Sequence, residues 1–304
     1  MLKKICAFFM ALMILSGAVL AASRSTPSVP EVDYKALTVD EQIAAQMNEW
    51  NRPEMRVIQE SAIDLDNWHY QYKTGSISID EYEYLLKSAG KSQDYINRAR
   101  KTLPFDVEIS DSHVSEGQLQ KGIVLANYTL GVTHVTQSNG YYCGPASAYM
   151  ALKYAAPWQM TSKTQSDLAS ELGTSASAGT DWYLGGSGPD AYPMWKVFDS
   201  YLGVSTTSAM VFNNSVTSTN LTNRIVRAID LGYPIAYNMQ GSMNGQNYPS
   251  GHWMTIIGYK NYGSTLVIAD PAKGLYGLNP TSAVFETTVA AVLSAGMWKG
   301  IVSP

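Results

Sequence analysis

The chain has 304 residues and a formal net charge of −4; apolar residues make up 45% of it and charged residues 15%. This length suffices for one large domain or two smaller ones, and the apolar content excludes a chain that is disordered throughout. The acidic balance argues against a nucleic-acid-binding protein, which needs a basic surface.

Residues 1–22 have the pattern of a secretory signal peptide. Lys3 and Lys4 make a basic start, residues 5–20 are apolar and uncharged, and small residues follow this run. A retained membrane anchor is the alternative, although a membrane span needs about 20 apolar residues. We therefore expect a protein that is exported by this signal peptide, either secreted or at the cell surface, where it would meet the cell envelope.

The number and positions of the cysteines limit the possible functions further. The chain has two cysteines, and Cys6 lies within the predicted signal peptide. Cys143 is then the single thiol of an exported protein, so it has no partner for an internal disulfide bond. Such a thiol is buried, bonded to another chain, or used in chemistry.

Residues 23–35 contain two prolines and few apolar side chains, which favours a linker. Residues 36–115 are expected to form a helical N-terminal region, because apolar residues recur in much of it at helical spacing. From residue 104 onward the composition favours strands, so we place a second domain at 116–304. A pro-region, a chaperone and a docking unit all remain open as the role of the helical region.

One stretch resembles half of a metal site. Residues 73–81 match the second half of a calcium-binding EF-hand loop, with Gly75 and Glu81 at the required spacing. The preceding positions, which need carboxylates, hold Tyr70 and Tyr72 instead. We expect a helix–turn–helix here, and no metal site in the chain.

Residues 116–304 combine helix and strand patterns. Helices are expected at 143–154, 164–172, 194–202 and 219–231, most of them ended by a glycine. Strands are expected at 234–239, 252–258, 264–270 and 297–302. Helices followed by a sheet predict an α+β domain.

Cys143 stands at the start of a predicted helix and follows a loop with the sequence Gln137-Ser-Asn-Gly-Tyr-Tyr. The free N–H groups and the dipole of a helix N-terminus favour a thiolate and lower the pKa of the thiol. The same N–H groups can bind an oxyanion, and the side-chain amide of Gln137 is a candidate second donor. Pro145 suits the first turn, where no N–H is needed.

His252 and Asp270 fall on two apolar segments that flank an Asn- and Gly-rich turn, which predicts a β-hairpin. If the hairpin is symmetric about Asn261, His252 and Asp270 are direct cross-strand partners, with Cβ atoms about 4.5–5.5 Å apart. A slip of one residue would place the two side chains on opposite faces. The pairing is therefore a sharp structural expectation.

Three motifs, Gln-x5-Cys-Gly-Pro-Ala, Gly-His-Trp and Ala-Asp-Pro, resemble those of the cysteine peptidases named for the double-glycine leader peptidases of bacteriocin exporters. The resemblance covers about residues 130–304 and is closest to the family's stand-alone secreted branch. It implies a papain-like fold, with Cys143 as nucleophile, His252 as base, Asp270 as its orienting partner and Gln137 in the oxyanion hole. The family's namesakes are joined to membrane transporters, whereas this chain carries a predicted signal peptide.

These residue types suit amide hydrolysis, because a thiolate attacks the carbonyl, an imidazole carries the proton and a carboxylate orients the imidazole. We therefore expect a secreted, bacterial cysteine peptidase that acts on peptides or proteins and needs no cofactor. An acyl or peptidyl transferase, an amidase, and a non-catalytic peptide-binding module with this fold are the alternatives. Taken singly, each residue also has a structural explanation, such as a buried thiol or a core histidine, and the oligomeric state stays open.

Overall fold

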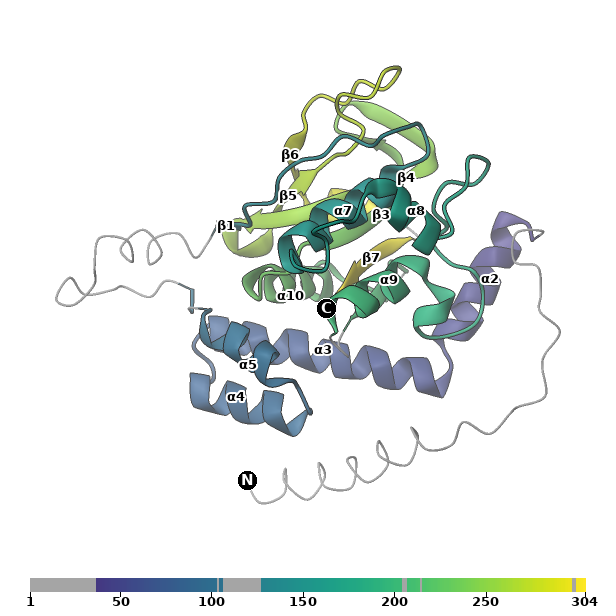
Figure 1. Ribbon diagram of the computed structural model, residues 1–304. Coiled ribbons are helices and arrows are strands. Elements are labelled where there is room, and N and C mark those ends of the chain that lie inside the picture. The colour runs from purple at the N-terminus through teal and green to yellow at the C-terminus, as the bar shows by residue number, and fades with distance from the viewer. Residues whose placement is uncertain (1–36, 103, 106–126, 204–206, 214, 297–298) are drawn as a thin grey trace, which may run out of the picture. The chain divides into compact units, whose positions relative to one another are not determined.

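The computed structural model describes residues 37–102, 104–105, 127–203, 207–213, 215–296 and 299–304 (Figure 1). Contacts group Thr38–Pro304 into one compact unit. The predicted signal peptide, the predicted linker and the strand-like residues 106–126 lie outside the described residues. The boundary expected between the two domains therefore stays a prediction. None of the helices within the described ranges is both long and apolar enough to cross a membrane.

Within the described residues, helices occur in both the N-terminal and the C-terminal half of the sequence. The α-helices are α2 (Val39–Trp50), α3 (Pro53–Lys73), α4 (Ile79–Ser88), α5 (Gln93–Arg100), α7 (Cys143–Ala155), α8 (Gln165–Glu171), α9 (Pro193–Leu202), α10 (Ser218–Asp230) and α11 (Val289–Ala295). The short 3-10 turns are η2 (Pro189–Ala191) and η3 (Asn261–Gly263). Every helix expected from the sequence in the second domain is present, with its ends within two residues of the expected range.

Local sequence explains where these helices begin and end. Thr164 caps α8, because its side chain accepts from the Asp167 N–H while the Asp167 carboxylate accepts from the Thr164 N–H. Thr217 and Asn220 form the same arrangement at the start of α10. Gly203 ends α9 with a left-handed backbone, a conformation that glycine adopts without steric cost.

The described strands form one antiparallel sheet in the order β2-β7-β3-β4-β5-β6, with β1 also paired to β4. Their bounds are β1 (Tyr128–Thr129), β2 (Ser208–Val211), β3 (Ile235–Met243), β4 (Gln246–Lys260), β5 (Thr265–Ala269), β6 (Val284–Thr288) and β7 (Gly300–Ser303). The four expected strands correspond to β3, β4, β5 and β7. The sequence did not indicate β2 and β6.

Helices pack on both faces of this sheet. On β5, Val267 lies in a small apolar cluster with Met150 of α7, while its neighbour Leu266 belongs to the core that includes α10. Successive side chains of a strand point to opposite faces, so α7 and α10 cover different faces of the sheet. Figure 1 shows α7 and α10 separated by the sheet. This mixed architecture confirms the α+β fold expected from the sequence.

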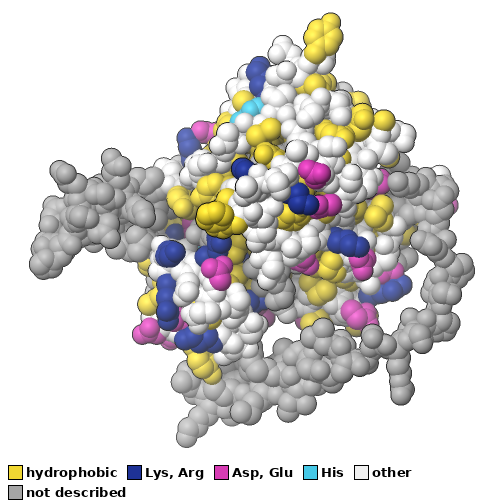
Figure 2. All heavy atoms as spheres, in the orientation of Figure 1, with side chains coloured by type: hydrophobic (Ala, Val, Ile, Leu, Met, Phe, Trp, Pro, Cys, Tyr) yellow, Lys and Arg dark blue, Asp and Glu magenta, His cyan; other side chains and the backbone are white. Residues whose placement is uncertain are grey.

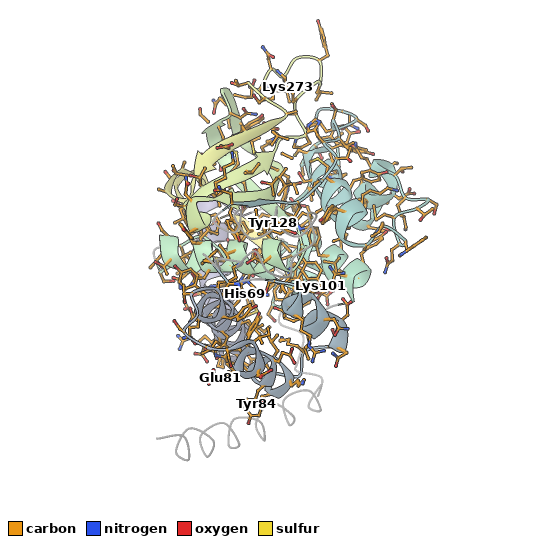
Figure 3. All side chains as sticks on the ribbon, turned by 90° about the vertical axis from the view of Figure 1, so that its left-hand side faces the viewer. His69, Glu81, Tyr84, Lys101, Tyr128 and Lys273 are labelled. Atoms are coloured by element: carbon orange, nitrogen blue, oxygen red, sulfur yellow. The ribbon has the colours of Figure 1, made fainter. Side chains whose placement is uncertain are left out.

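The N-terminal helices pack against the sheet-bearing half through buried charges between α3 and α10. The carboxylate of Asp66 accepts from the Nε atoms of Arg224 and Arg227 at 2.8 and 2.7 Å. In return, Asp230 of α10 accepts from His69 Nε2 at 2.9 Å and lies 3.1 Å from Lys73 Nζ. His69 lies on the side of α3 that faces α10 (Figure 3). Burial lowers the pKa of His69, so its ring stays neutral and donates to Asp230.

These contacts fix the register of α3 on α10. A buried ion pair contributes little net stability, but removing one partner leaves a buried charge uncompensated. The reciprocal arrangement, an acid on each helix paired with bases on the other, therefore disfavours any sliding of α3. Elsewhere on the exterior, positive and negative side chains are interspersed on the face seen in Figure 2.

Candidate active site

Cys143 is the first residue of α7, as the sequence predicts, and its side chain is partly exposed. The first turn of α7 packs closely against the loop before α9. A Cβ atom on Gly144 would lie 2.2 Å from Thr180 Oγ1, so only glycine fits at this position. The Thr180 carbonyl accepts from the indole N–H of Trp253 on β4 at 3.1 Å. The cysteine is thus held where the helix N-terminus meets β4.

His252 and Asp270 are brought together, with His252 Nε2 donating to Asp270 Oδ1 at 2.8 Å. Both side chains are buried. Nevertheless, the direct cross-strand pairing expected for them is wrong. Continuing the register of Ile256 with Ile268 places Asp270 opposite Met254, so His252 lies two residues away on the diagonal.

The turn causes this difference, because strand pairing beside it begins at Lys260↔Thr265 and the hairpin is therefore not symmetric about Asn261. A β-bulge then changes the register once more. The register between β4 and β5 shifts by one residue at Ile257, between the pairs Gly258↔Val267 and Ile256↔Ile268. Without the extra residue, His252 and Asp270 would point to opposite faces of the sheet. The Ile257 carbonyl accepts instead from Leu130 N–H at 2.8 Å, just beyond β1. Gly258 makes room for β1, since a Cβ atom there would lie 2.6 Å from the Tyr128 carbonyl oxygen.

Asp270 is held by more partners than the imidazole. Its Oδ1 also accepts from the Ala272 N–H at 3.0 Å, and its Oδ2 accepts from Tyr248 Oη at 2.9 Å and Asn244 Nδ2 at 3.1 Å. Burial alone would raise the pKa of this carboxyl, but the bonds from His252, Asn244 and Ala272 lower it. Asp270 is therefore a carboxylate that can orient and stabilise a protonated imidazole.

The imidazole and the thiol are coupled. Burial would raise the pKa of Cys143, but its hydrogen bond with His252 and the backbone N–H groups of Trp253 and Gly144 lower it. Burial would lower the pKa of His252, but the hydrogen bonds with Asp270 and Cys143 raise it to about 9. Because Nε2 is bonded to Asp270, Nδ1 is the ring nitrogen available to the thiol. The two shifts favour a thiolate–imidazolium pair.

Sequence comparison agrees with this geometry. The family model described as "Peptidase_C39 like family" matches residues 129–288, which is more than half of the chain. This chain belongs to that family. A search of the curated proteins finds no match for it. Membership indicates a cysteine peptidase acting on peptides or proteins, and the matched region includes all four expected site residues. The N-terminal helices α2–α5 lie outside the match.

Gln137 occupies the loop of this C39-like domain that leads to Cys143. Its backbone N–H donates to the Pro271 carbonyl at 2.8 Å, which joins the cysteine loop to the residue after Asp270. Its side chain is buried; Nε2 donates to the Asn139 carbonyl at 2.7 Å, and Oε1 has no partner. The structure thus places Gln137 beside the Asp270 segment but shows no direct bond between Gln137 and Cys143.

Tyr248 and Asn244 are site residues of this C39-like chain that the motifs did not reveal. Both lie at the end of the β3–β4 hairpin, where Asn244 has a φ of 52° and Gly245 a φ of 75°. Asn-Gly is the strongest sequence signal for a two-residue hairpin turn. That signal would have placed the turn, although not its contact with Asp270, which is 26 residues away from Asn244.

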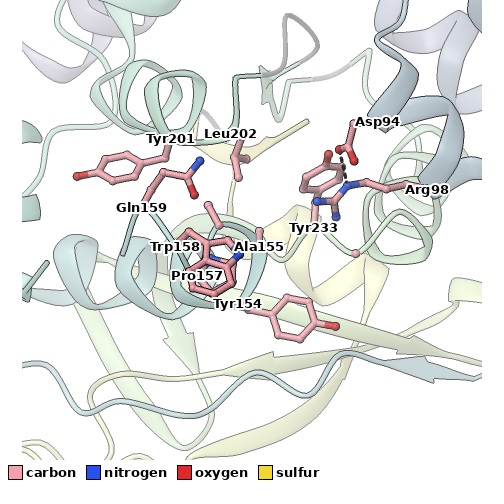
Figure 4. A pocket seen from close by; sticks show the side chains of 12 residues that line it. Asp94, Arg98, Tyr154, Ala155, Pro157, Trp158, Gln159, Tyr201, Leu202 and Tyr233 are labelled. Carbon is pink, nitrogen blue, oxygen red and sulfur yellow. Dashed lines mark hydrogen bonds and ion pairs between the residues drawn. The ribbon is translucent and has the colours of Figure 1, made fainter. Parts of the chain in front are cut away.

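A surface hollow of about 530 Å³ lies elsewhere, where α5 and the ends of α7, α9 and α10 meet (Figure 4). Its lining includes Tyr154, the exposed Trp158 and the Asp94–Arg98 ion pair. It lies at the opposite end of α7 from Cys143, about 18 Å along the helix axis. None of the candidate catalytic residues lines this hollow, so it is not the active site.

Proposed function

We propose that the protein is a secreted cysteine peptidase that hydrolyses peptide bonds through Cys143, His252 and Asp270. The observation that carries this proposal is the 2.8 Å hydrogen bond between His252 and the buried Asp270 carboxylate, together with a Cys143 thiol at the start of α7 whose pKa His252 lowers. Family membership supports the same chemistry. The predicted signal peptide, residues 1–22, supports export and places the substrates outside the cell or in its envelope.

In the proposed reaction, the Cys143 thiolate attacks the carbonyl carbon of a peptide bond. The carbonyl electrons move to oxygen and then return as the C–N bond breaks, while His252 gives its proton to the leaving amine. This leaves an acyl-thioester. His252 then takes a proton from water, the hydroxide attacks the thioester, and Cys143 leaves as the thiolate. Asp270 stays ionised throughout and holds the imidazole in place. No cofactor enters these steps.

The oxyanion formed in both steps needs hydrogen-bond donors. The N-terminus of α7 offers backbone N–H groups beside Cys143, and we assign the second donor to Gln137. Its amide nitrogen carries two hydrogens, one of which is bonded to the Asn139 carbonyl, which leaves the other for a substrate oxygen. Losing one such donor typically lowers kcat about 100- to 1000-fold.

The test uses residues 23–304 and a mixture of synthetic peptides, with products identified by mass spectrometry. Hydrolysis that is abolished in Cys143→Ala and His252→Ala supports the peptidase. Adding a primary amine distinguishes a hydrolase from a transferase. Transfer of the acyl group to the amine in preference to water would show that the protein is a transferase. If the folded wild-type protein binds peptides but hydrolyses none of them, it is a peptide-binding module and not an enzyme.

A further inference from the structure

The ring of Tyr248 lies flat on the ring of His252. Their centroids are 3.9 Å apart and the ring planes differ by 9°. Both side chains are buried, Tyr248 at 5% and His252 at 3% exposure, so water does not compete for this face of the imidazole. The two residues are four positions apart on β4, and Gly251 between them has a φ of 92°, which allows the chain to fold one ring over the other.

The same tyrosine also bonds to the partner of that imidazole. Its hydroxyl donates to Asp270 Oδ2 at 2.9 Å, while His252 donates to Oδ1 at 2.8 Å. Burial and the neighbouring carboxylate hold the pKa of Tyr248 well above its ordinary value, so the hydroxyl remains a proton donor. One side chain therefore contacts both members of the His252–Asp270 pair and constrains each relative to the other.

These two contacts have separate physical effects. An aromatic face attracts a cation, so the stacked ring stabilises imidazolium over neutral imidazole, and it also fixes the ring plane that aims Nδ1 at Cys143. The hydroxyl and Asn244 together occupy Oδ2, which keeps the carboxylate from rotating away from Nε2. The other groups that face this cluster are the Cys143 thiol, from α7, and the His134 ring, which bonds to the Asp270 carbonyl at 2.8 Å.

We propose that Tyr248 is a positioning residue of the catalytic centre, which stabilises the His252 imidazolium by stacking and orients Asp270 by its hydroxyl. This role rests on the proposed function of Cys143 and His252. Asn244 supports Tyr248 from the same hairpin end, where its side chain also bonds the Ser282 carbonyl at 2.6 Å and the Ser282 N–H at 3.1 Å. The end of the β3–β4 hairpin thereby completes a site whose reacting groups lie on other segments.

The test measures alkylation of Cys143 and peptide turnover against pH in residues 23–304, where Cys143 is the sole cysteine. Tyr248→Leu removes ring and hydroxyl, and should raise the pH of half-maximal alkylation by roughly one to one and a half units, the size of a desolvated cation–π contact. Tyr248→Phe keeps the ring, so it should leave that midpoint near the wild-type value. Its turnover should fall roughly 10- to 100-fold with KM unchanged, as for loss of one hydrogen bond to a charged group.

Tyr237→Phe is the matched control. Tyr237 is buried on β3, and its hydroxyl donates to the Val292 carbonyl at 3.0 Å, away from His252. This variant should lose some thermal stability but keep the wild-type midpoint and turnover. A midpoint shift of the same size in Tyr237→Phe, or wild-type midpoints and turnover in both Tyr248 variants, would overturn the proposal. If Tyr248→Leu does not fold, the turnover of Tyr248→Phe decides. Failure of the proposed function would look different, since the wild-type thiol itself would then titrate near its free value.

Discussion

His252 and Asp270 share a 2.8 Å hydrogen bond although they are diagonal neighbours across β4 and β5 and not direct partners. The extra residue at Ile257 makes this bond geometrically accessible, because it returns both side chains to one face of the sheet. The candidate site therefore depends on a backbone irregularity five residues away from the histidine. Bulges near active sites commonly re-aim a side chain in this manner.

Removing the bulge is expected to dismantle the site. Deleting Ile257 joins Ile256 to Gly258 without the extra residue, so His252 and Asp270 should point to opposite faces and peptide turnover should be lost. Ile257→Ala is the control, because it keeps the bulge while it loses packing in the small apolar cluster that includes Met150. That variant should lose about 2–5 kcal/mol of unfolding free energy in urea but keep the thiol reactivity. Full activity in the deletion variant would contradict this role of the bulge.

The pH dependence of peptide hydrolysis should be bell-shaped. Turnover should rise with pH through the lowered pKa of Cys143, because the thiolate is the nucleophile, and fall as pH passes about 9, where His252 loses its proton. Asp270→Asn removes the carboxylate that helps to raise the pKa of His252, so the alkaline limb should move to lower pH. Initial rates between pH 4 and 10 test this. A wild-type rate still rising at pH 10 would exclude the ion pair.

Breaking the charge cluster between α3 and α10 should destabilise the whole unit. Asp66→Ala leaves the buried guanidinium groups of Arg224 and Arg227 without their carboxylate, which is expected to cost about 3–5 kcal/mol. Asp64→Ala, on the exposed side of the same helix, should change stability by less than about 0.5 kcal/mol. Urea denaturation followed by circular dichroism measures both. Equal stability of the two variants would show that the cluster does not hold α3 in place.

Removing the N-terminal helices tests whether they are a permanent part of the fold or a pro-region that can be cleaved off. A chain that begins at residue 106 would expose the face of α10 that carries Arg224 and Arg227, which now contact Asp66 and Tyr95, and we expect it to be insoluble or unfolded. Co-expression of residues 23–105 as a separate chain should restore solubility, because the contacts between α3 and α10 are non-covalent. A truncated chain that is folded and more active than the full one would instead identify a pro-region.

Much of the structure of residues 127–304 follows from the sequence because its signals are local. Caps such as Thr164 and the glycine after α9 act within a few residues, and the position of Cys143 follows from the helix after it. The strand register at His252 could not be predicted, since it depends on the bulge at Ile257. The carbonyl of Ile257 accepts a hydrogen bond from the N–H of Leu130, which is far away in the chain. Tyr248 could not be predicted as a site residue for a similar reason, because its role depends on the Asp270 carboxylate, 22 residues later. The partners of Asp66 are about 160 residues away, beyond any local pattern.

The most direct test of the central claim is the reaction of iodoacetamide with Cys143 across pH 4–9, in the wild type and in His252→Ala. If Cys143 and His252 form an activated pair, the wild-type thiol should be alkylated at a pH well below the free-thiol pKa of about 8.5. In the variant, the pH needed for alkylation should shift to about that value. A wild-type thiol that reacts only near or above pH 8.5, unchanged by the substitution, would contradict the assignment of Cys143 and His252 as a catalytic pair.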